Sequence, residues 1–311
     1  MSIPVVIIHR GNPLYLNIAI KQAKHYNNDV ILIGDDSNKQ ICLDAGVLHY
    51  DIGSFPNQLS KQFSGVYEHM STNTREFEYL CFDRWFILLE LMKREKLESV
   101  LHIDSDVMLY DNIPLLFKDM VRKYSSGYCI AQQKYEEYKW DASAHTSFWK
   151  TQALEHFCYF ILEQYTDKVD ELRQKWDWHH RENIAGGVCD MNLLYLYYIH
   201  NESSVINLTA VNASDITFDN NVNNSGNLFP NEYRMGKSLL LFTTKKLEMV
   251  NNKPIGENLV LGKKVRIGSL HFQGEAKKLM FHFFQDKVPL PQTISALAST
   301  GKVLVKKMLG K

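Results

Sequence analysis

The sequence predicts an α/β fold with a largely parallel central sheet and helices on both of its faces. Two observations carry this prediction. First, β-branched apolar runs at residues 5–8 and 30–33 flank a segment with helical spacing at 14–26, and such an alternation forms a right-handed parallel unit. Second, an apolar strand at 99–103 ends in two carboxylates, at the position where open α/β sheets bind ligands.

The composition is that of an ordinary soluble globular protein. The 311 residues suffice for one large domain or two small ones, and 45% of them are hydrophobic and 23% charged. The 35 basic residues balance the 35 acidic ones, so no global electrostatic attraction to nucleic acid is expected. The apolar run near the N-terminus is too short for a signal peptide or a membrane span. The five cysteines lack CxxC spacing, which favours reduced thiols and a cytoplasmic location.

The first two predicted strands end in polar loops. His9, Arg10 and Gly11 follow the first strand, and Asp35 and Asp36 follow the second. Because the carboxyl ends of adjacent parallel strands lie at one edge of a sheet, these loops should lie together. A turn or cap role accounts for Asp35 and Asp36 as well as a ligand-binding role does.

The strongest helix signal in the chain lies at residues 76–95, where apolar and aromatic residues recur at three- to four-residue spacing. Arg84 lies within this helix. It is either a solvated helix arginine or a planar guanidinium that holds phosphate or ribose oxygens. Upstream, residues 47–51 are predicted to form a short strand, and the polar segment 58–74 is predicted to be irregular.

The stretch SVLHIDSDVMLY at residues 99–110 contains the most informative acids. Asp104 and Asp106 are separated only by Ser105, and alternate side chains of a strand share one face. Two adjacent carboxylates repel and raise each other's pKa. The arrangement becomes favourable when a divalent cation that prefers oxygen ligands lies between them. The alternative is a solvated strand end with two turn-forming acids.

A further strand is predicted at residues 128–133, and Thr146 or Ser147 can cap the helix that follows. Several residues before or at the start of that helix are suited to contact a sugar, namely Trp140, Asp141, His145, Ser147 and Trp149. The alternative is that Trp149 lies in the core and His145 on the surface.

Glycines mark a second candidate binding segment. Gly186 and Gly187 allow a backbone to approach a ligand closely or to take positive φ. Asp190 follows within reach of this turn.

A third candidate segment follows a strand predicted at residues 265–270. His271 comes directly after the strand, and neutral imidazole is a suitable third metal ligand beside two carboxylates. Gly274 permits close backbone approach, and Lys277 can neutralise a phosphate.

Four of these segments, in this order, resemble the motifs of glycosyltransferase family 8, a family with the GT-A fold. The Asp-Ser-Asp after an apolar strand is similar to the family's metal-binding DxD motif, and CFDRWFILLELM at 81–92 is similar to the arginine-containing helix before it. NIAGGVCDMN at 183–192 resembles the family's Asn-Ala-Gly-Val segment with one extra glycine. HFQGEAK at 271–277 resembles the HxxGxxK motif, although Lys278 and Leu279 stand where the family usually has Pro-Trp.

The resemblance implies a GT-A domain over residues 1–285 and a retaining, metal-dependent reaction. A hexose would pass from a UDP-sugar to a hydroxyl group of a glycan or glycolipid. The resemblance implies that Asp104, Asp106 and His271 hold Mn²⁺ or Mg²⁺, and that Asp190 contacts the transferred sugar or the acceptor. The other residues expected to contact the nucleotide sugar or its diphosphate are His9, Arg10, Gly11, Asp35, Asp36, Arg84, Ser105, Gly186, Gly187, Gly274 and Lys277.

Two other classes of protein are compatible with the sequence. A sugar-phosphate nucleotidyltransferase shares Asp-rich metal sites, but only HRGN at 9–12 comes near the Gly-rich phosphate loop with Arg and Lys expected of that class. A non-catalytic nucleotide-sugar or carbohydrate-binding protein is the other, although the intact Asp104, Asp106, His271 and Lys277 argue against a decayed site.

Two segments are expected to lie outside the regular elements. Residues 214–235 are rich in asparagine, and this composition predicts a loop. The loop is expected to be mobile or to face the acceptor; a disordered surface loop is the equal alternative. The basic tail at 286–311 is compatible with an amphipathic helix at the inner membrane surface, although Gly301 interrupts it. A tail that packs on the domain or frays in solution fits equally well.

Overall fold

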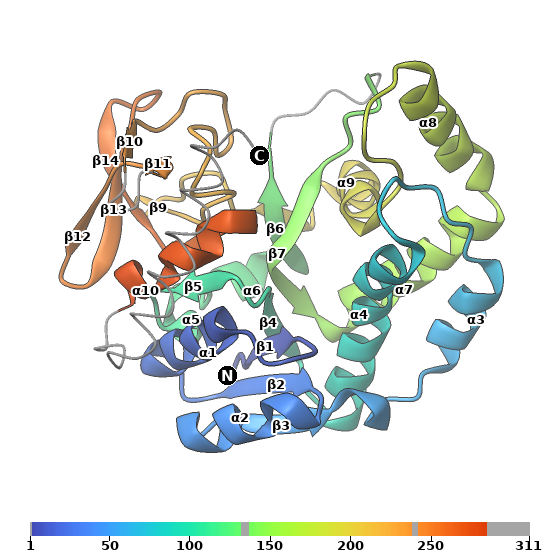
Figure 1. Ribbon diagram of the computed structural model, residues 1–311, viewed down its shortest axis with the longest axis horizontal. Coiled ribbons are helices and arrows are strands. Elements are labelled where there is room, and N and C mark those ends of the chain that lie inside the picture. Colours follow the sequence, from blue (N-terminus) through green and yellow to red (C-terminus); the bar gives the residue numbers. More distant parts are fainter. Residues whose placement is uncertain (1, 132–136, 238–241, 285–311) are drawn as a thin grey trace, which may run out of the picture.

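Residues 2–131, 137–237 and 242–284 are described by the computed structural model, and they form a layered α/β structure (Figure 1). Its central sheet has seven strands in the order β3-β2-β1-β4-β7-β6-β8. Strand β7 runs antiparallel to β4 and β6, whereas the other adjacent pairs are parallel. The predicted class, α/β with a largely parallel sheet, is confirmed. The strands are β1 (Val5–Ile8), β2 (Val30–Gly34), β3 (Leu48–Asp51), β4 (Ser99–Ile103), β6 (Ser126–Ile130), β7 (Ala142–Lys150) and β8 (Val205–Asn207).

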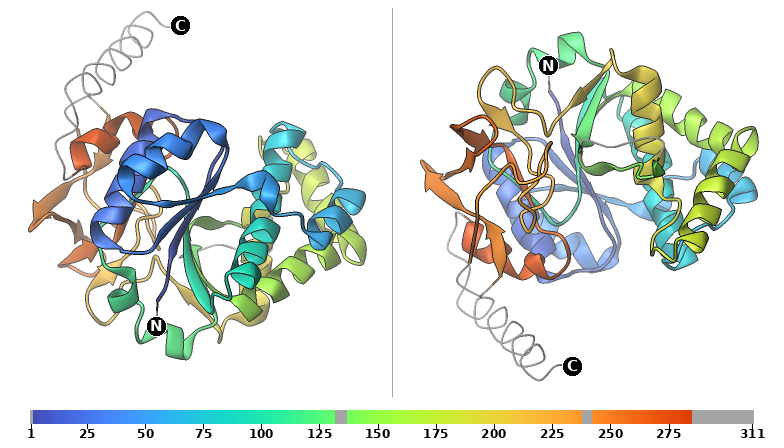
Figure 2. Two further views of the ribbon diagram at one scale, coloured as in Figure 1. Left: turned by 90° about the horizontal axis from the view of Figure 1, so that it is seen from below. Right: turned by 90° about the horizontal axis from the view of Figure 1, so that it is seen from above.

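Helices cover both faces of this sheet (Figure 2). Val5 and Ile7 pack with residues of α1 and α2, whereas Val6 packs with residues of α4, α7 and α9. The alternation of side chains along a strand produces this division. Burial of both faces is typical of parallel strands and explains why β1 reads as a continuous apolar run. The helices are α1 (Leu14–Tyr26), α2 (Lys39–Ala45), α4 (Arg75–Arg94), α7 (Thr151–Thr166) and α9 (Asp190–Asn201).

The C-terminal part of the described chain forms smaller sheets beside the central one (Figure 1). The pairing that matters for the site is antiparallel, between β5 (Val107–Leu109) and β15 (Ser269–His271), and it sets His271 opposite Val107. Leu270 and Phe272 beside it are fully buried with residues of α1, and each contributes roughly 1.5–3 kcal/mol of burial free energy. The remaining strands are β9 (Ile216–Thr217), β10 (Met235–Lys237), β11 (Thr243–Lys245), β12 (Leu247–Val250), β13 (Lys253–Asn258) and β14 (Lys263–Ile267).

The long helix α4 carries Arg84 and is determined by local sequence. Thr74 accepts a hydrogen bond from the Phe77 N–H at the first turn, and acidic residues occupy that turn while Lys93 and Arg94 occupy the last. These placements favour the helix through its cap and its dipole. Its apolar face, which includes Phe82 and Leu89, is fully buried.

Two predictions of where helices lie are wrong. Residues 58–74 contain the helix α3 (Gln58–Val66), whose Phe63 is fully buried among aromatic rings. Thr146 and Ser147 lie inside β7, and the helix begins only at Thr151. In both segments tertiary contacts override the local signal: Phe63 packs against α4, and β7 pairs with strands on both sides.

In the described part of the chain, no helix is long and apolar enough to span a membrane. The tail predicted at 286–311 lies outside the described residues. The helices and 3₁₀ turns not yet named are η1 (Asp36–Asn38), η2 (Ile52–Ser54), α5 (Ile113–Leu116), α6 (Met120–Lys123), α8 (Val169–Arg181), η4 (Gly274–Leu279) and α10 (Met280–Phe283).

Candidate functional site

The candidate site lies where β1, β2 and β4 end. The loop after β1 is joined to the loop after β2, because the Gly11 N–H donates to Asp35 Oδ2 over 2.7 Å. Asp35 also accepts from the Ser37 N–H and thereby caps η1. Hydrogen bonds from Ser37 and Gly11 lower the pKa of Asp35. The cap role that the sequence allowed for Asp35 is therefore present, and Asp36 instead forms an exposed ion pair with Lys39.

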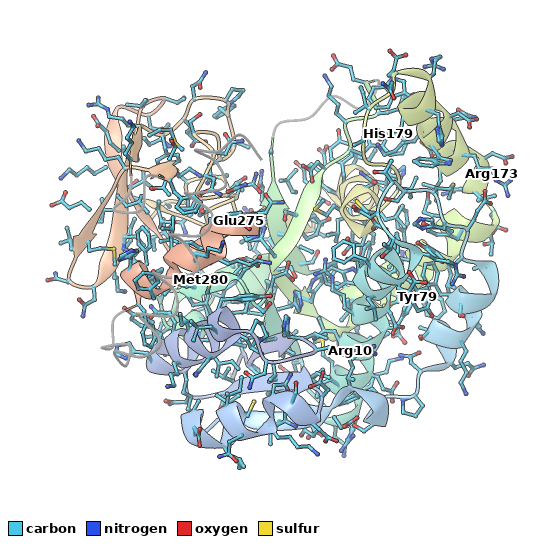
Figure 3. The ribbon with its side chains drawn as sticks, in the orientation of Figure 1. Arg10, Tyr79, Arg173, His179, Glu275 and Met280 are labelled. Atoms are coloured by element: carbon cyan, nitrogen blue, oxygen red, sulfur yellow. The ribbon has the colours of Figure 1, made fainter. Side chains whose placement is uncertain are left out.

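A cavity of about 350 Å³ opens beside the end of β1. His9 and Arg10 line it from the loop after β1, and Arg84 lines it from α4 together with the exposed residues Phe77 and Leu80. Figure 3 shows Arg10 between the helical part of the molecule and the C-terminal segment that carries Glu275. The size of the cavity and its mixture of apolar walls and a few cationic groups are typical of small-ligand pockets.

The Asp-Ser-Asp segment forms a turn and not a continuous strand. Asp104 follows the last residue of β4, the Val107 N–H donates to its carbonyl over 3.1 Å, and β5 begins at Val107. The two carboxylates therefore have different surroundings: the Asp104 side chain is 33% exposed and the Asp106 side chain 12%. Ser105, predicted to contact the donor, lies between them and is buried.

Arg84 reaches from α4 to two carboxylates. Its Nη1 donates to Asp104 Oδ1 over 2.8 Å, and its Nε donates to Asp190 Oδ2 over 3.2 Å. The indole N–H of Trp85 also donates to Asp190 Oδ2, over 3.0 Å. The Arg84 side chain is only 15% exposed, so the interpretation as a solvated helix arginine is wrong. Asp190, the first residue of α9, is oriented by these donors.

The surroundings keep Asp104 ionised. Burial alone would raise its pKa, but the Arg84 guanidinium and the neighbouring histidines lower it to about 2. His102, one of those histidines, shows the opposite effect of burial on a basic group, because desolvation lowers its pKa to about 4. The site thus presents a carboxylate together with a neutral imidazole near neutral pH.

Asp106 is paired with the C-terminal segment. Its Oδ1 lies 3.6 Å from His271 Nε2, and its Oδ2 lies 3.2 Å from Lys277 Nζ. His271 Nδ1 lies 2.7 Å from the carbonyl oxygen of Asn220. Since a carbonyl only accepts, Nδ1 carries a proton, and Nε2 lies on the side of Asp106.

The donor atoms fit a cation such as Mn²⁺ or Mg²⁺, but they are not assembled around one point. Asp106 and His271 lie together, whereas Asp104 is bonded to Arg84. Among the residues that the structure describes, no three or more His, Cys, Asp or Glu side chains form a group able to hold a metal ion. Two carboxylates and an imidazole are the chemistry such an ion needs, and binding through Asp104 would require this carboxylate to exchange Arg84 for the ion.

The predicted glycines have identifiable structural reasons. Gly187 has φ +141°, and a Cβ there would lie 2.2 Å from the carbonyl oxygen of Met70. Gly186 exchanges hydrogen bonds with Thr72. The turn thus packs against residues 70–72, and a contact with the donor remains a prediction. Gly274 has φ +61° with open space beside it.

Two residues of this region have surroundings that the sequence analysis did not foresee. His145, one alternative for which was a surface position, is fully buried and stacks on His271 with ring centroids 4.0 Å apart. Asp141 is an exposed residue within electrostatic range of Asp190 and Lys175, and partial desolvation raises its pKa. The core position of Trp149 is confirmed. The position of His102 near Asp104 could have been predicted, because strand alternation places the two residues on the same face.

Comparisons with known proteins give only weak structural similarities, all with TM-scores below 0.5. No family model and no curated protein matches the chain. Mouse xyloside xylosyltransferase 1 in its apo form is 10% identical, with a TM-score of 0.48 over 67% of this chain and 85% of that one. Galactosyltransferase LgtC in complex with donor and acceptor sugar analogs is 12% identical, with a TM-score of 0.37 over 70% and 76%. A cytidylyltransferase from Leptospira borgpetersenii is 10% identical, with a TM-score of 0.37 over 67% and 75%. At these values an assignment of function rests on the site itself.

Proposed function

We propose that the protein is a metal-dependent glycosyltransferase of the GT-A type, related to glycosyltransferase family 8. It transfers a hexose from a UDP-sugar to a hydroxyl group of a glycan or glycolipid, with retention at the anomeric carbon. The observation that carries the proposal is the meeting of Asp106, His271 and Lys277 across the β5–β15 pair, next to Asp104 at the end of β4.

Each group of the site has a role in this proposal. Asp104, Asp106 and His271 would hold Mn²⁺ or Mg²⁺, whose charge stabilises the diphosphate leaving group. Lys277, whose ammonium group contacts Asp106 in the free protein, binds the diphosphate oxygens. The loops after β1 and β2 and the cavity beside Arg10 receive the nucleoside.

Asp190 orients the sugar in this proposal. Its Oδ2 is already engaged by Arg84 and Trp85, which lowers its strength as a nucleophile because the negative charge is neutralised. A carboxylate held in this way is suited to accept a hydrogen bond from a sugar hydroxyl. Retention rests on the resemblance to the family.

Calorimetric titration of UDP and UDP-hexoses with and without Mn²⁺ tests the binding step. UDP binding should depend on Mn²⁺ in the wild type, and His271→Ala and Asp106→Asn should each weaken that dependence about 10- to 100-fold. Tyr159→Phe, on the exposed outer side of α7, is the control and should bind as the wild type does. UDP binding that is indifferent to Mn²⁺ in every variant contradicts the metal site.

Analysis of the products distinguishes the possible reactions. Incubation with a UDP-hexose and oligosaccharide acceptors should give UDP and a glycoside with the anomeric configuration of the donor, as read by NMR. Release of pyrophosphate from a sugar phosphate and a nucleoside triphosphate would instead identify a nucleotidyltransferase. Binding of a UDP-sugar without turnover in the presence of an acceptor panel would identify a binding protein.

A further inference from the structure

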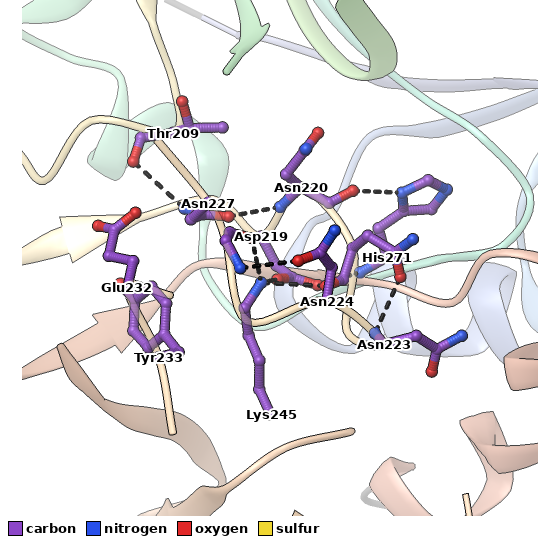
Figure 4. Close-up of polar contacts among 12 residues, drawn as sticks. Thr209, Asp219, Asn220, Asn223, Asn224, Asn227, Glu232, Tyr233, Lys245 and His271 are labelled. Carbon is purple, nitrogen blue, oxygen red and sulfur yellow. Dashed lines mark hydrogen bonds and ion pairs between the residues drawn. The ribbon is translucent and has the colours of Figure 1, made fainter. Parts of the chain in front are cut away.

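A buried ion pair lies next to the candidate metal site, because one of its members, Asp219, contacts the backbone of His271. Lys245 of β11 and Asp219 form an ion pair, and both side chains are completely buried. The ammonium group also donates to the carbonyl oxygens of Asn221, over 3.0 Å, and Gly226, over 3.2 Å. Its three N–H donors therefore hold three points of one loop, residues 219–226 (Figure 4). This loop belongs to the asparagine-rich segment that the sequence predicted to be mobile, to face the acceptor or to be disordered.

The same loop holds His271 directly through two acceptors and indirectly through a third. Asp219 Oδ2 accepts from the His271 backbone N–H over 3.1 Å, and the Asn220 carbonyl accepts from His271 Nδ1 over 2.7 Å. The Asp219 carbonyl lies 2.8 Å from His145 Nε2, and His145 stacks on the His271 ring at an interplanar angle of 9°. Consecutive carbonyl groups of the loop thus fix two stacked imidazoles.

We propose that Lys245 is a positioning residue that sets the tautomer and the orientation of His271. By holding the loop at Asp219, Asn221 and Gly226, it directs the Asn220 carbonyl at His271 Nδ1, which places the proton of the neutral ring on Nδ1 and turns Nε2 toward Asp106. The effect on metal affinity rests on the proposed function, whereas the effect on the tautomer does not. Outer partners of metal-ligating histidines act in this way, and their loss weakens metal binding about 10- to 100-fold.

A purely structural ion pair is the competing explanation. Burying two charges carries a desolvation cost, and replacing such a pair by neutral residues is often tolerated. The distinction lies in His271: a structural pair affects stability alone, whereas a positioning pair also changes the protonated nitrogen of the ring.

The test uses the double variant Asp219→Asn/Lys245→Met, because removing only one partner would leave an uncompensated buried charge. The asparagine introduced in place of Asp219 would retain an oxygen for the His271 N–H, so the variant removes mainly the bonds that Lys245 makes to the loop. The control is Lys253→Met, which removes a lysine from an ion pair with Asp111 but leaves Asp111 paired with Arg266.

The first measurement is long-range ¹⁵N–¹H NMR of histidine-labelled protein without metal, with the His271 signals assigned by loss in His271→Gln. The wild type should show His271 protonated at Nδ1, and the double variant a mixture of tautomers, while Lys253→Met resembles the wild type. A wild-type His271 protonated at Nε2 overturns the proposal even if the double variant does not fold. A folded double variant with the wild-type tautomer also overturns it.

The second measurement is the affinity for Mn²⁺ in the presence of UDP, determined by quantifying free Mn²⁺ with electron paramagnetic resonance. The folded double variant should bind Mn²⁺ about 10- to 100-fold more weakly than the wild type, and the control should bind it equally. A changed tautomer with unchanged Mn²⁺ affinity supports positioning by Lys245 and contradicts the use of His271 as a ligand. Failure of the proposed function is therefore distinguishable from failure of this inference.

Discussion

Arg84 is the residue on which the electrostatics of the candidate site depend most. It neutralises Asp104 and Asp190, which lie 20 and 106 positions away in the sequence. Helix periodicity predicts the helix that carries Arg84, but no local pattern predicts carboxylates so distant in the chain. The expectation that Asp104 and Asp106 repel and raise each other's pKa is wrong for Asp104, because Arg84 and the neighbouring histidines outweigh burial and lower its pKa.

Replacing Arg84 with Gln should lower the free energy of unfolding by about 3–5 kcal/mol. The reason is that Asp190, with a side chain only 3% exposed, loses its charged partner and remains buried. Urea denaturation monitored by circular dichroism measures the loss. Arg173→Gln, which breaks an exposed pair with Glu68, is the control and should change stability little.

The same variant separates stability from metal binding. Mn²⁺ should raise the melting temperature of Arg84→Gln more than that of the wild type, because Arg84 no longer competes with the ion for Asp104. Equal shifts in both proteins would show that Asp104 does not take part in binding the ion.

At the scale of elements, α8 is joined to the β6–β7 connection by a buried lysine. Lys175 Nζ donates to the Tyr138 carbonyl over 2.7 Å and lies 2.9 Å from His179 Nε2. His179 in turn bonds the Ile184 carbonyl at the start of the turn that contains Gly186. Burial lowers the pKa of Lys175 to about 8.

This pKa gives α8 a pH-dependent contribution to stability. Between pH 8 and pH 10.5 the unfolded chain binds the Lys175 proton and the folded chain does not, so the wild type should become more stable as the pH rises through this window. Relative to Lys175→Met, the gain should reach up to about 3 kcal/mol, because one pKa unit corresponds to about 1.4 kcal/mol. Urea denaturation of both proteins at several pH values measures it. A constant difference between them would contradict the depressed pKa.

At the scale of the whole molecule, the β5–β15 pair connects the middle of the chain to its C-terminal part. A ligand that binds Asp106 and His271 together should therefore protect both strands at once. Amide hydrogen exchange should slow at residues 104–110 and 269–277 when Mn²⁺ and UDP are added, and it should not change in the β12–β13 hairpin. Protection of only one of the two segments would contradict a shared site.

The sequence by itself determined the elements with strong local signals and the positions of the conspicuous acids. The apolar runs of β1, β2 and β4 and the periodicity of α4 are local signals, and strand ends in a parallel sheet lie at one edge, so Asp35 and Asp104 were predictable at the same edge. The group expected from the acids and the family motifs was Asp104, Asp106 and His271, with Lys277 beside them. The structure brings Asp106, His271 and Lys277 together, whereas Asp104 is bonded to Arg84.

Only the tertiary structure decided how the side chains are partnered. The buried position of His145, the two carboxylates of Arg84 and the loop held by Lys245 all depend on contacts between segments far apart in the chain. Burial and pairing of charges depend on what surrounds a group in three dimensions, and local sequence does not encode these surroundings. For this reason the asparagine-rich segment, for which composition predicted only a loop, contacts and supports His271.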